Sequence, residues 1–308
     1  MSVQRKYAKK LHECLLALVL YLTSCQMQLA SEHPDLRRKY EQLVASEDTF
    51  GFFAQTWVQD ILHPNWEYLL NDSQEPIIRL PYTKKFGMKA YLQPLFLRSL
   101  PLLFGNSIAN LSLLKSKLFL HLNFDSQASL VGEKQIGKYQ QLQWTEGIAA
   151  IRAGYSENVK RNLKKSKDLD LQPINYQQFQ EFFIAQKGEK LGNLNAAAWT
   201  RLAALYTAAQ EKEQAFCSGV WSGSTLLAVG LFFRYKQQLY FMKGTLNDEG
   251  KQVGALVFLL DAVLQNFADT CNALDFVGSN QESIAAFYRK FGAKDKTYGV
   301  VKGRISLV

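Results

Sequence analysis

Residues that bind metals or form disulfides are scarce in this sequence and widely spaced where they occur. The 308 residues include four cysteines and four histidines. No two cysteines form a C-x-x-C pair, which excludes the usual zinc-ribbon and thioredoxin-type sites. No H-x-H or H-x-x-x-H spacing occurs either, so the sequence predicts no metal site. A G-x-S-x-G elbow and a P-loop are also absent, so the common hydrolase and nucleoside-triphosphatase motifs are excluded.

Length and composition describe an ordinary globular protein with an excess of positive charge. A chain of 308 residues is long for one domain and suits two, each able to bury its own core. Apolar residues make up 47% of the chain, charged residues 20%, and the formal net charge is +9. A surplus of this size favours anionic partners such as nucleotides, phosphorylated cofactors, nucleic acids or membrane surfaces, without choosing among them.

Residues 1–48 are expected to form a helical extension of the protein body. The segment 34–44 repeats apolar side chains at helical spacing. Before it, basic residues precede the apolar run 15–22 and then Cys25, an order that also fits a lipoprotein-type signal ending at that cysteine. The apolar run is far too short to span a membrane. We therefore expect a cytoplasmic protein, with the processed signal as the minor alternative.

The segment 49–167 alternates strand-like stretches with turns and closes in a basic helical run. Strand-like stretches include residues 77–81 and 118–122. The closing run from Glu146 to Lys167 is interrupted at Ser156, a residue type suited to begin a second helix. We interpret this segment as a degenerate first domain that ends in a basic connecting helix.

Residues 168–308 show a clearer order of elements and are interpreted as the second domain. Two helices, at 176–186 and 196–213, precede three antiparallel strands between Ala215 and Lys243. A helix from Gly254 is apolar nearly all round and must be buried. A strand, a helix and a final strand pair follow. An antiparallel meander that changes to βαβ differs from the doubly wound nucleotide-binding order, and it indicates an α+β fold.

Small and charged residues stand between the third strand and the buried helix. The stretch Gly244 to Ala255 contains Gly250, Lys251 and Gly254. Small residues allow backbone N–H groups to point outward, and the N-terminus of a helix adds positive potential, so such a loop can cradle a pyrophosphate. Lys251 would add a point charge. The alternative is a plain turn followed by a helix cap.

A strand–helix boundary near the C-terminus carries the second group of residues. The strand is expected to end at Gly278, and Ser279 or Asn280 to cap the helix that follows. Gly292 is a natural residue to end that helix. On these features alone, the segment is a capped helix that packs aromatic side chains in the core.

The connecting helix is strongly basic, with five basic residues within eight positions. Val159 and Leu163 are four residues apart and give the helix one apolar stripe, which leaves the charged side chains exposed. The helix is either a solvated face or a surface for a polyanion. Its basic residues are Lys160, Arg161, Lys164, Lys165 and Lys167.

These motifs resemble those of the GNAT acyltransferases, and their order along the chain resembles the tandem-GNAT, Fem-type peptidoglycan-bridge transferases of bacteria. The glycine loop matches in part the GNAT pattern Gln/Arg-x-x-Gly-x-Gly/Ala. The helix with Phe287-Tyr288 and Phe291-Gly292-Ala293 matches the closing GNAT helix. The resemblance runs from about residue 49 to the C-terminus. The stretches that match the Fem-type group are 53–57, 80–87, 155–166 and 275–279.

The resemblance implies two GNAT-like domains and an acyl-CoA-dependent N-acyltransferase that uses coenzyme A or acetyl-CoA as co-substrate and no metal. The amine of a small molecule or peptide would attack the thioester directly. Tyr288 would protonate the leaving thiolate, and Asp275 is the second catalytic candidate. The coenzyme would be held by Lys243, Gly244, Gly250, Lys251, Gln252, Gly254, Ala255 and Asn280.

Two departures from the resemblance leave alternatives open. Fem-type enzymes that use aminoacyl-tRNA tend to have a lysine where this chain has Tyr288, and related sequences have glutamate where this chain has Val277. The second departure removes a plausible general base. The alternatives are transfer from aminoacyl-tRNA to a cell-wall precursor, which the +9 charge favours, and a catalytically inactive GNAT-fold binding protein.

Overall fold

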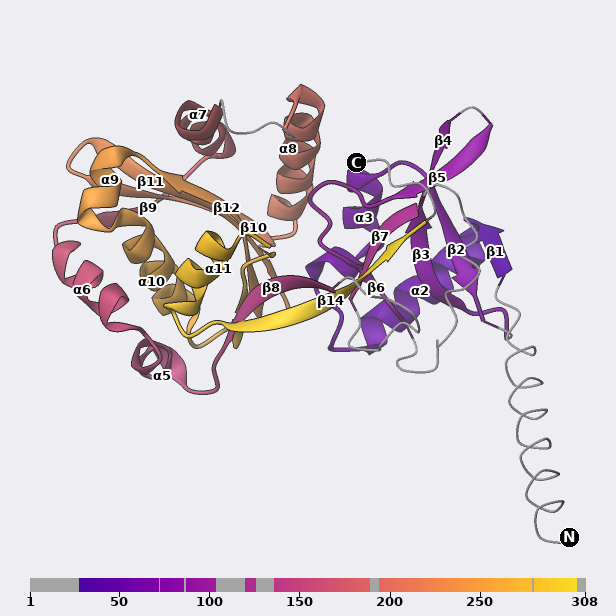
Figure 1. Cartoon of the computed structure of the whole chain (residues 1–308), viewed down its shortest axis with the longest axis horizontal. Coiled ribbons are helices and arrows are strands. Elements are labelled where there is room, and N and C mark those ends of the chain that lie inside the picture. Colours follow the sequence, from indigo (N-terminus) through magenta and orange to yellow (C-terminus); the bar gives the residue numbers. More distant parts are fainter. Residues whose placement is uncertain are drawn as a thin grey trace, which may run out of the picture.

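The computed structural model describes residues 28–71, 73–85, 87–103, 120–125, 136–188, 194–278 and 280–303. The signal-like segment with Cys25 lies outside the described residues, as does Ser279. The described chain forms two halves that share one large mixed sheet (Figure 1). No helix in this part of the chain is long and apolar enough to cross a membrane.

The first half combines a small antiparallel sheet with one side of the large sheet. Residues 28–31 form a strand where a helix was expected, because their backbone pairs with residues 67–70. The helix expected at 34–44 is present as α2. The elements are β1 (Gln28–Ser31), α2 (Pro34–Ser46), the 3-10 helix η1 (Phe52–Ala54), α3 (Thr56–Leu62), β2 (Trp66–Leu70), β3 (Pro76–Pro81), β4 (Thr83–Lys85), β5 (Met88–Leu92), β6 (Leu100–Pro101), β7 (Leu120–Asp125) and β8 (Ile136–Gln143).

The second half follows the element order predicted from the sequence. Ser156 caps α6 as expected, since its hydroxyl accepts the N–H of Val159. Three details differ: residues 170–174 form a strand that was not expected, residues 248–253 are helical where a loop was expected, and the described end of the chain forms one long strand. The elements are α5 (Gly147–Ala153), α6 (Glu157–Lys165), β9 (Asp170–Ile174), α7 (Tyr176–Lys187), α8 (Ala196–Gln210), β10 (Ala215–Ser222), β11 (Thr225–Tyr235), β12 (Gln238–Leu246), α9 (Asp248–Val253), α10 (Ala255–Phe267), β13 (Ala273–Asp275), α11 (Glu282–Arg289) and β14 (Lys294–Lys302).

The strands on either side of the β14–β8 pair repeat one pairing pattern. Its order is β4-β5-β7-β14-β8-β13-β12-β11-β10-β9, with β6 paired to β7. Strands β5 and β7 are parallel, as are β12 and β13. Strand β14 is antiparallel to β7, and β8 is antiparallel to β13. The same pattern is therefore met on both sides of the centre, which confirms the two GNAT-like units although their sequences show no repeat.

Each half contributes its last described strand to the other half. Strand β8 follows the first half in sequence but pairs with β13, and β14 follows the second half but pairs with β7. The two strands also pair with each other through six residue pairs. Figure 1 shows them side by side between the halves. Separating the halves would break this pairing.

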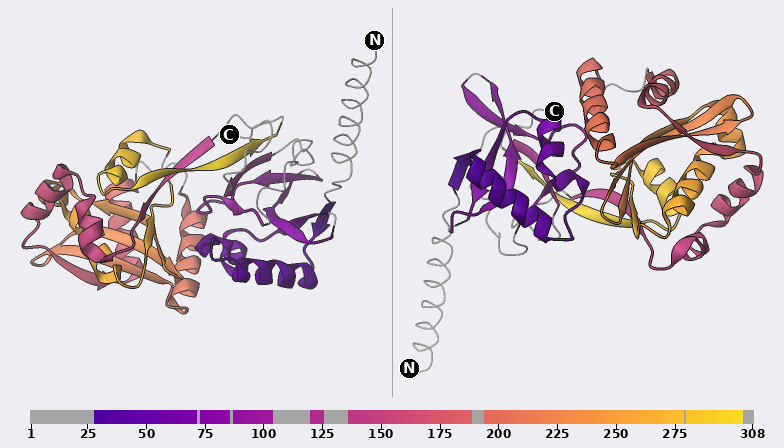
Figure 2. Two further views of the ribbon diagram at one scale, coloured as in Figure 1. Left: turned by 90° about the horizontal axis from the view of Figure 1, so that it is seen from below. Right: turned by 180° about the vertical axis from the view of Figure 1, so that it is seen from behind.

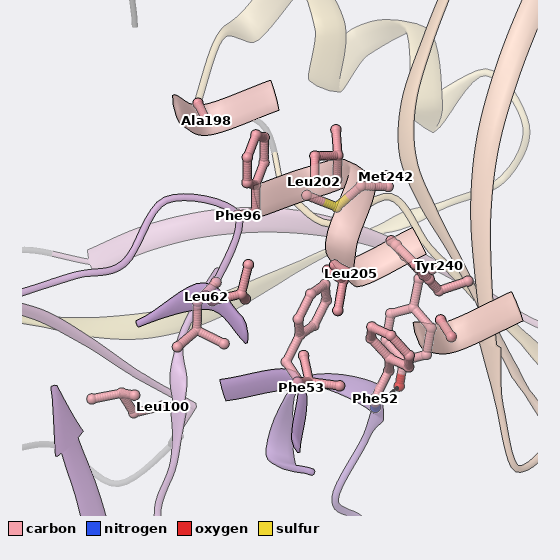
Figure 3. Close-up of a cluster of buried hydrophobic side chains, with 14 of the residues drawn as sticks. Phe52, Phe53, Leu62, Phe96, Leu100, Ala198, Leu202, Leu205, Tyr240 and Met242 are labelled. Carbon is pink, nitrogen blue, oxygen red and sulfur yellow. Dashed lines mark hydrogen bonds between the residues drawn. The ribbon is translucent and has the colours of Figure 1, made fainter. Parts of the chain in front are cut away.

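Two hydrophobic cores lie on opposite faces of the second-half sheet. Helices α7 and α8 cover one face, and α10 and α11 cover the other (Figures 1 and 2). The α7–α8 core continues into the first half, where Phe52 stacks on Phe233 with ring centroids 4.5 Å apart. The N–H of Phe52 also donates to the Tyr240 hydroxyl at 3.0 Å. Figure 3 shows this core, with Phe96 of the first half beside Met242 of β12.

Helices α5 and α6 pack on the second half, although they precede residue 168. Tyr155 and Val159 are buried in the same core as α10. Arg152 pairs with Asp261 of α10, with its Nη2 2.6 Å from Oδ2. By contact, the second unit therefore includes these two helices, and the boundary placed at residue 167 stays a prediction.

The segment 28–48 is part of the protein body. Arg79 of β3 is fully buried, and its Nη2 lies 2.7 Å from Glu32 Oε1. Tyr40 of α2 is also fully buried, and its hydroxyl accepts a hydrogen bond from Gln59. The chain between β1 and α2 is thereby attached to the small sheet by a buried ion pair.

Substituting Gly137 tests the central strand pair. Gly137 of β8 faces Tyr298 of β14, and a Cβ added to it would lie 2.0 Å from the Tyr298 ring. We expect Gly137→Ala to lower the free energy of unfolding by about 1–3 kcal/mol, because overpacking displaces the ring. Urea denaturation measures this change. Gly188→Ala is the control, since the nearest atom to its added Cβ is 3.9 Å away.

If β8 and β14 pair as described, the loss in Gly137→Ala should shrink when Tyr298→Leu makes room for the added methyl. Additive effects of the two substitutions would contradict the pairing, since residues in contact show coupling energies of about 0.5–3 kcal/mol.

Candidate active site

A cleft opens where β12 and β13 separate. The two parallel strands pair through only three residue pairs, the last being Tyr240 with Asp275. Strand β12 then continues to Leu246 while β13 ends. A cavity of about 820 Å³ lies beyond this point, within the size range of small-molecule sites. Met242, Lys243, Phe276 and Tyr288 contribute to its wall.

The cavity reaches both faces of the sheet. Phe183 and Met242, which line it, belong to the core under α7 and α8. Phe276 and Tyr288, which also line it, belong to or pack against the core under α10 and α11. An opening through the sheet allows two reactants to enter from opposite sides and meet between the strands.

A β-bulge in β12 shapes the floor of the cleft. The pairing with β11 shifts by one residue, so that Leu231 faces Lys243 while Phe232 faces Phe241. Met242 is the extra residue, and bulges of this kind turn side chains and leave backbone groups outside the ladder. Because Leu231 points to the α7–α8 side, its partner Lys243 does so too. Two consecutive side chains, Met242 and Lys243, therefore point to the same face.

Lys243 is half-buried and has no described counter-ion. Burial lowers the pKa of its ammonium below the usual lysine value, and no carboxylate of the described residues forms an ion pair with it. The charged form is disfavoured in such a place unless an anion approaches. Lys187 of α7 lines the same cavity and is half-buried.

Tyr288 lies on α11 at the other side of the cleft. Its ring stacks on Phe276 with centroids 4.0 Å apart and meets Phe241 edge-on. Burial raises the pKa of the phenol above its usual range, because the phenolate would be poorly solvated there. Among the described residues the hydroxyl has no hydrogen-bond partner. Tyr288 therefore lies in the cavity wall, and its role as a proton donor stays a prediction.

Asp275 is held by the first half. It is buried at the end of β13 and forms an ion pair with Arg98, which comes from the loop after β5. The Arg98 guanidinium also lies over the Tyr139 ring, 3.8 Å from its centroid. Burial raises the pKa of the Asp275 carboxyl, although Arg98 opposes the shift. This carboxylate is engaged in an ion pair and lines a separate small cavity of about 80 Å³ between the halves.

The turn after β13 has a strained conformation. Val277 has φ +55°, a region that a β-branched side chain rarely adopts, and Gly278 has φ +103°. The N–H of Val277 donates to Asp275 Oδ1 at 2.7 Å. Arg98 and Asp275 therefore fix a strained turn that forms part of the cavity wall.

The residues of the expected pyrophosphate cradle are placed differently. Gly250, Lys251 and Gln252 lie in α9, and Gly254 ends that helix with φ +76°. The N–H groups of Gly250 and Lys251 already donate to Asn247, and that of Gly254 donates to Gly250. These three donors are used inside α9, whereas no side chain caps the start of α10 at Gly254, so the pyrophosphate cradle stays a prediction. Of the eight predicted coenzyme residues, the structure places Lys243 and Gly244 at the cavity.

Ala255 and Asn280, two more of the predicted coenzyme residues, make contacts within the protein itself. Ala255 is fully buried at the start of α10. Asn280 was expected to cap α11, but Gln281 occupies the N-cap position. The Asn280 amide instead accepts the N–H of Lys138 at 2.9 Å and donates to the Tyr298 hydroxyl at 3.1 Å. It thereby connects the start of α11 to both central strands.

The basic helix α6 lies beside the start of α10. A Cβ added to Gly254 would be 3.0 Å from the Cβ of Asn162, which lies on α6. Val159 is buried against α10, as its stripe predicted. The five basic side chains of the connecting helix and its end are exposed. The glycine loop and the basic helix, separate in sequence, therefore form one surface.

Sequence reasoning missed Arg98 and the bulge at Met242. Arg98 is 177 residues from its partner Asp275 and lies in no motif. The bulge follows from the register between β11 and β12, which the sequence of one strand does not fix.

Comparisons with known proteins show the fold. No protein-family model matches the chain, and no curated protein sequence matches it. The solved structure of FemX is 10% identical, with a TM-score of 0.61 over 89% of this chain and 97% of FemX. A conserved protein of unknown function from Bacteroides thetaiotaomicron is 8% identical, with a TM-score of 0.54 over 90% of this chain and all of that one. A tandem GNAT protein from the clavulanic acid pathway is 12% identical, with a TM-score of 0.49 over 89% of this chain and 97% of that one. The fold is the GNAT/Fem-like fold that the motifs predicted.

Removing Arg98 should destabilise the protein strongly. Arg98→Met leaves Asp275 buried without its counter-ion, and we expect a loss of about 3–5 kcal/mol in the free energy of unfolding, measured in urea. Adding Asp275→Asn should restore part of that loss, because the amide carries no charge. Lys160→Met, which removes an exposed ion pair with Glu157, serves as the control and should have little effect. A small loss in Arg98→Met would show that the pair is not desolvated.

Lys243 should make stability depend on pH. Its pKa is lowered in the folded state, so at alkaline pH the unfolded chain binds more protons and stability rises with pH. Lys243→Met should therefore be more stable than the wild type at neutral pH. The difference should stay constant below the folded pKa and shrink toward pH 10.5, the ordinary pKa of a lysine. Thermal melts across this range measure it. A difference that does not change with pH would contradict the burial of the ammonium, and the exposed Lys251→Met provides the baseline.

Proposed function

We propose that this protein is an N-acyltransferase that moves an activated acyl group to an amine. The observation that carries the proposal is the cavity between β12 and β13, which reaches both faces of the sheet and has the Tyr288 ring in its wall. Such an opening suits a reaction in which two bound molecules exchange a group without a covalent enzyme intermediate.

The protein's own groups would orient the reactants and move one proton. The amine nitrogen attacks the acyl carbonyl carbon, and the new C–N bond forms as the carbonyl oxygen gains negative charge. Backbone N–H groups at the Met242 bulge are suited to stabilise that oxygen. The bond to the leaving group then breaks, and Tyr288 donates its phenolic proton to the leaving atom. The nitrogen releases its extra proton to water, and a proton from water returns to the Tyr288 oxygen.

In this proposal Asp275 is a positioning residue. Its carboxylate pairs with Arg98 and accepts the Val277 N–H, so it holds the turn that borders the cavity. This chain has Val277 where related sequences have a glutamate, so Asp275 was the remaining carboxylate considered as a catalytic residue. Its place at the end of β13 supports the holding role.

Two donors are considered. The sequence resemblance favours an acyl-CoA thioester, with coenzyme A or acetyl-CoA as co-substrate and no metal. The second candidate is an aminoacyl-tRNA, because helix α9 occupies the expected pyrophosphate loop and the exposed basic face of α6 lies beside it. A polyanion could contact α6 without entering the loop.

The donor is tested by incubating the protein with a panel of amines and, in separate reactions, acetyl-CoA, longer acyl-CoAs and aminoacyl-tRNA. Mass spectrometry should detect an acylated amine and the free thiol of coenzyme A. A product with aminoacyl-tRNA alone would assign the second donor. Absence of product from every donor, with binding of a small molecule retained, would overturn the enzymatic proposal and leave a binding protein.

Tyr288→Phe isolates the proposed proton transfer. The substitution keeps the ring that stacks on Phe276 and removes the hydroxyl. We expect the turnover number to fall by about 10²–10⁴-fold, while donor affinity and melting temperature stay nearly unchanged. Tyr235→Phe, at the end of β11, is the matched control. Unchanged turnover in Tyr288→Phe would assign the tyrosine a packing role only.

A further inference from the structure

The α7 side of the cleft is mainly apolar, and this feature is not needed for transfer of a small acyl group. Phe96, Leu97, Phe183 and Met242 line the cavity and belong to the buried core, and Leu194 packs against it. Leu95 completes this wall and has 40% of its surface exposed. A wall of this composition removes apolar surface of a ligand from water.

Exposed apolar side chains continue around the mouth of the cavity. Of the five large hydrophobic residues exposed in the described chain, Leu95 and Ile284 line the cavity, and Ile184 lies on α7 next to Phe183. Leu95 and Ile284 therefore place exposed apolar surface at the cavity, which suits an apolar ligand.

Three cationic side chains line the cavity, Lys187, Lys243 and Arg98, and of these Arg98 is paired with Asp275. The bulge at Met242 turns Lys243 to the α7 face, where it lines the cavity with Lys187 of α7. Lys243 has no described counter-ion, so an anion entering the cavity would gain a charge-assisted hydrogen bond in a poorly solvated place.

We propose that the α7 side of the cleft binds an anionic amphiphile, a small molecule with an apolar chain and one acidic group, whose acidic group pairs with Lys243. Both the apolar wall and Lys243 are needed: the wall selects the chain, and the lysine selects the charge.

Binding is tested with three ten-carbon probes that differ only in their polar end: decanoate, decanol and decylamine. Competition against a fluorescent dansylated fatty acid, below the critical micelle concentration, gives their affinities. We expect decanoate to bind most tightly and decylamine most weakly. Shortening the chain to hexanoate should weaken binding, because fewer methylene groups are buried.

Substitutions separate the two contributions. Lys243→Met should lower decanoate affinity about 10- to 100-fold and leave decanol affinity unchanged, since a hydrogen bond to a charged group is lost. Lys243→Arg should keep the preference for the carboxylate. Lys251→Met removes an exposed lysine and is the charge control. Leu95→Ser should weaken all three probes, whereas Met88→Ser, another exposed apolar residue outside the cavity wall, should weaken none.

Equal affinity for decanoate and decylamine would overturn the proposal, as would equal losses in Lys243→Met and Lys251→Met. Melting temperatures of all variants identify any that fail to fold, and Lys243→Arg supplies the charge test if Lys243→Met is among them. The assay needs no turnover, so it is independent of the proposed function. Decanoate binding without acyl transfer would contradict only the enzymatic proposal. Acyl transfer to polar amines without decanoate binding would contradict only the proposed binding of an anionic amphiphile.

Discussion

Six residue pairs between β8 and β14 join two strands that have each left their own half of the chain. Each half thereby completes the sheet of the other, since β8 pairs with β13 and β14 with β7. The exchange converts two short sheets with open inner edges into one continuous sheet, which removes edges that would otherwise be free to pair with other chains. It also explains why one core, with Phe52 stacked on Phe233, runs through both halves.

The cleft depends on this exchange. Strand β13 has three residues, held by β12 on one side and by β8 on the other. The first half therefore supplies one of the two strands that hold β13 in place. It also supplies Arg98, whose ion pair with Asp275 fixes the strained turn at Val277. The first half has no recognisable catalytic motif in its sequence, but it is part of the site. Its strand β8 holds β13 in place beside β12, and its loop at 95–98 closes one side of the cavity.

The sequence predicted those features that local physics determines. The all-apolar pattern of α10, the Ser156 cap of α6 and the meander of the second half follow from neighbouring residues, and the structure contains them. Features that depend on residues far away in the sequence could not be predicted. The partners of β8 and β14 follow from no local periodicity, and Arg98 meets Asp275 across 177 residues. The turn of Lys243 into the cavity depends on a one-residue shift in the pairing of β11 with β12.

The glycine loop between Gly244 and Ala255 shows why a partial motif does not identify the ligand. Gly250 is needed for a packing reason, because an added Cβ would lie 2.5 Å from the carbonyl oxygen of Leu227. Gly254 is needed for a backbone reason, since it ends α9 in the left-handed conformation that glycine favours. Both glycines are thus explained without a phosphate. The residues with no such internal explanation are Lys243, half-buried without a described counter-ion, and Leu95 and Ile284, which line the cavity and are exposed. Substrate chemistry in this fold is therefore better inferred from the cleft between the separated strands than from the loop that follows them.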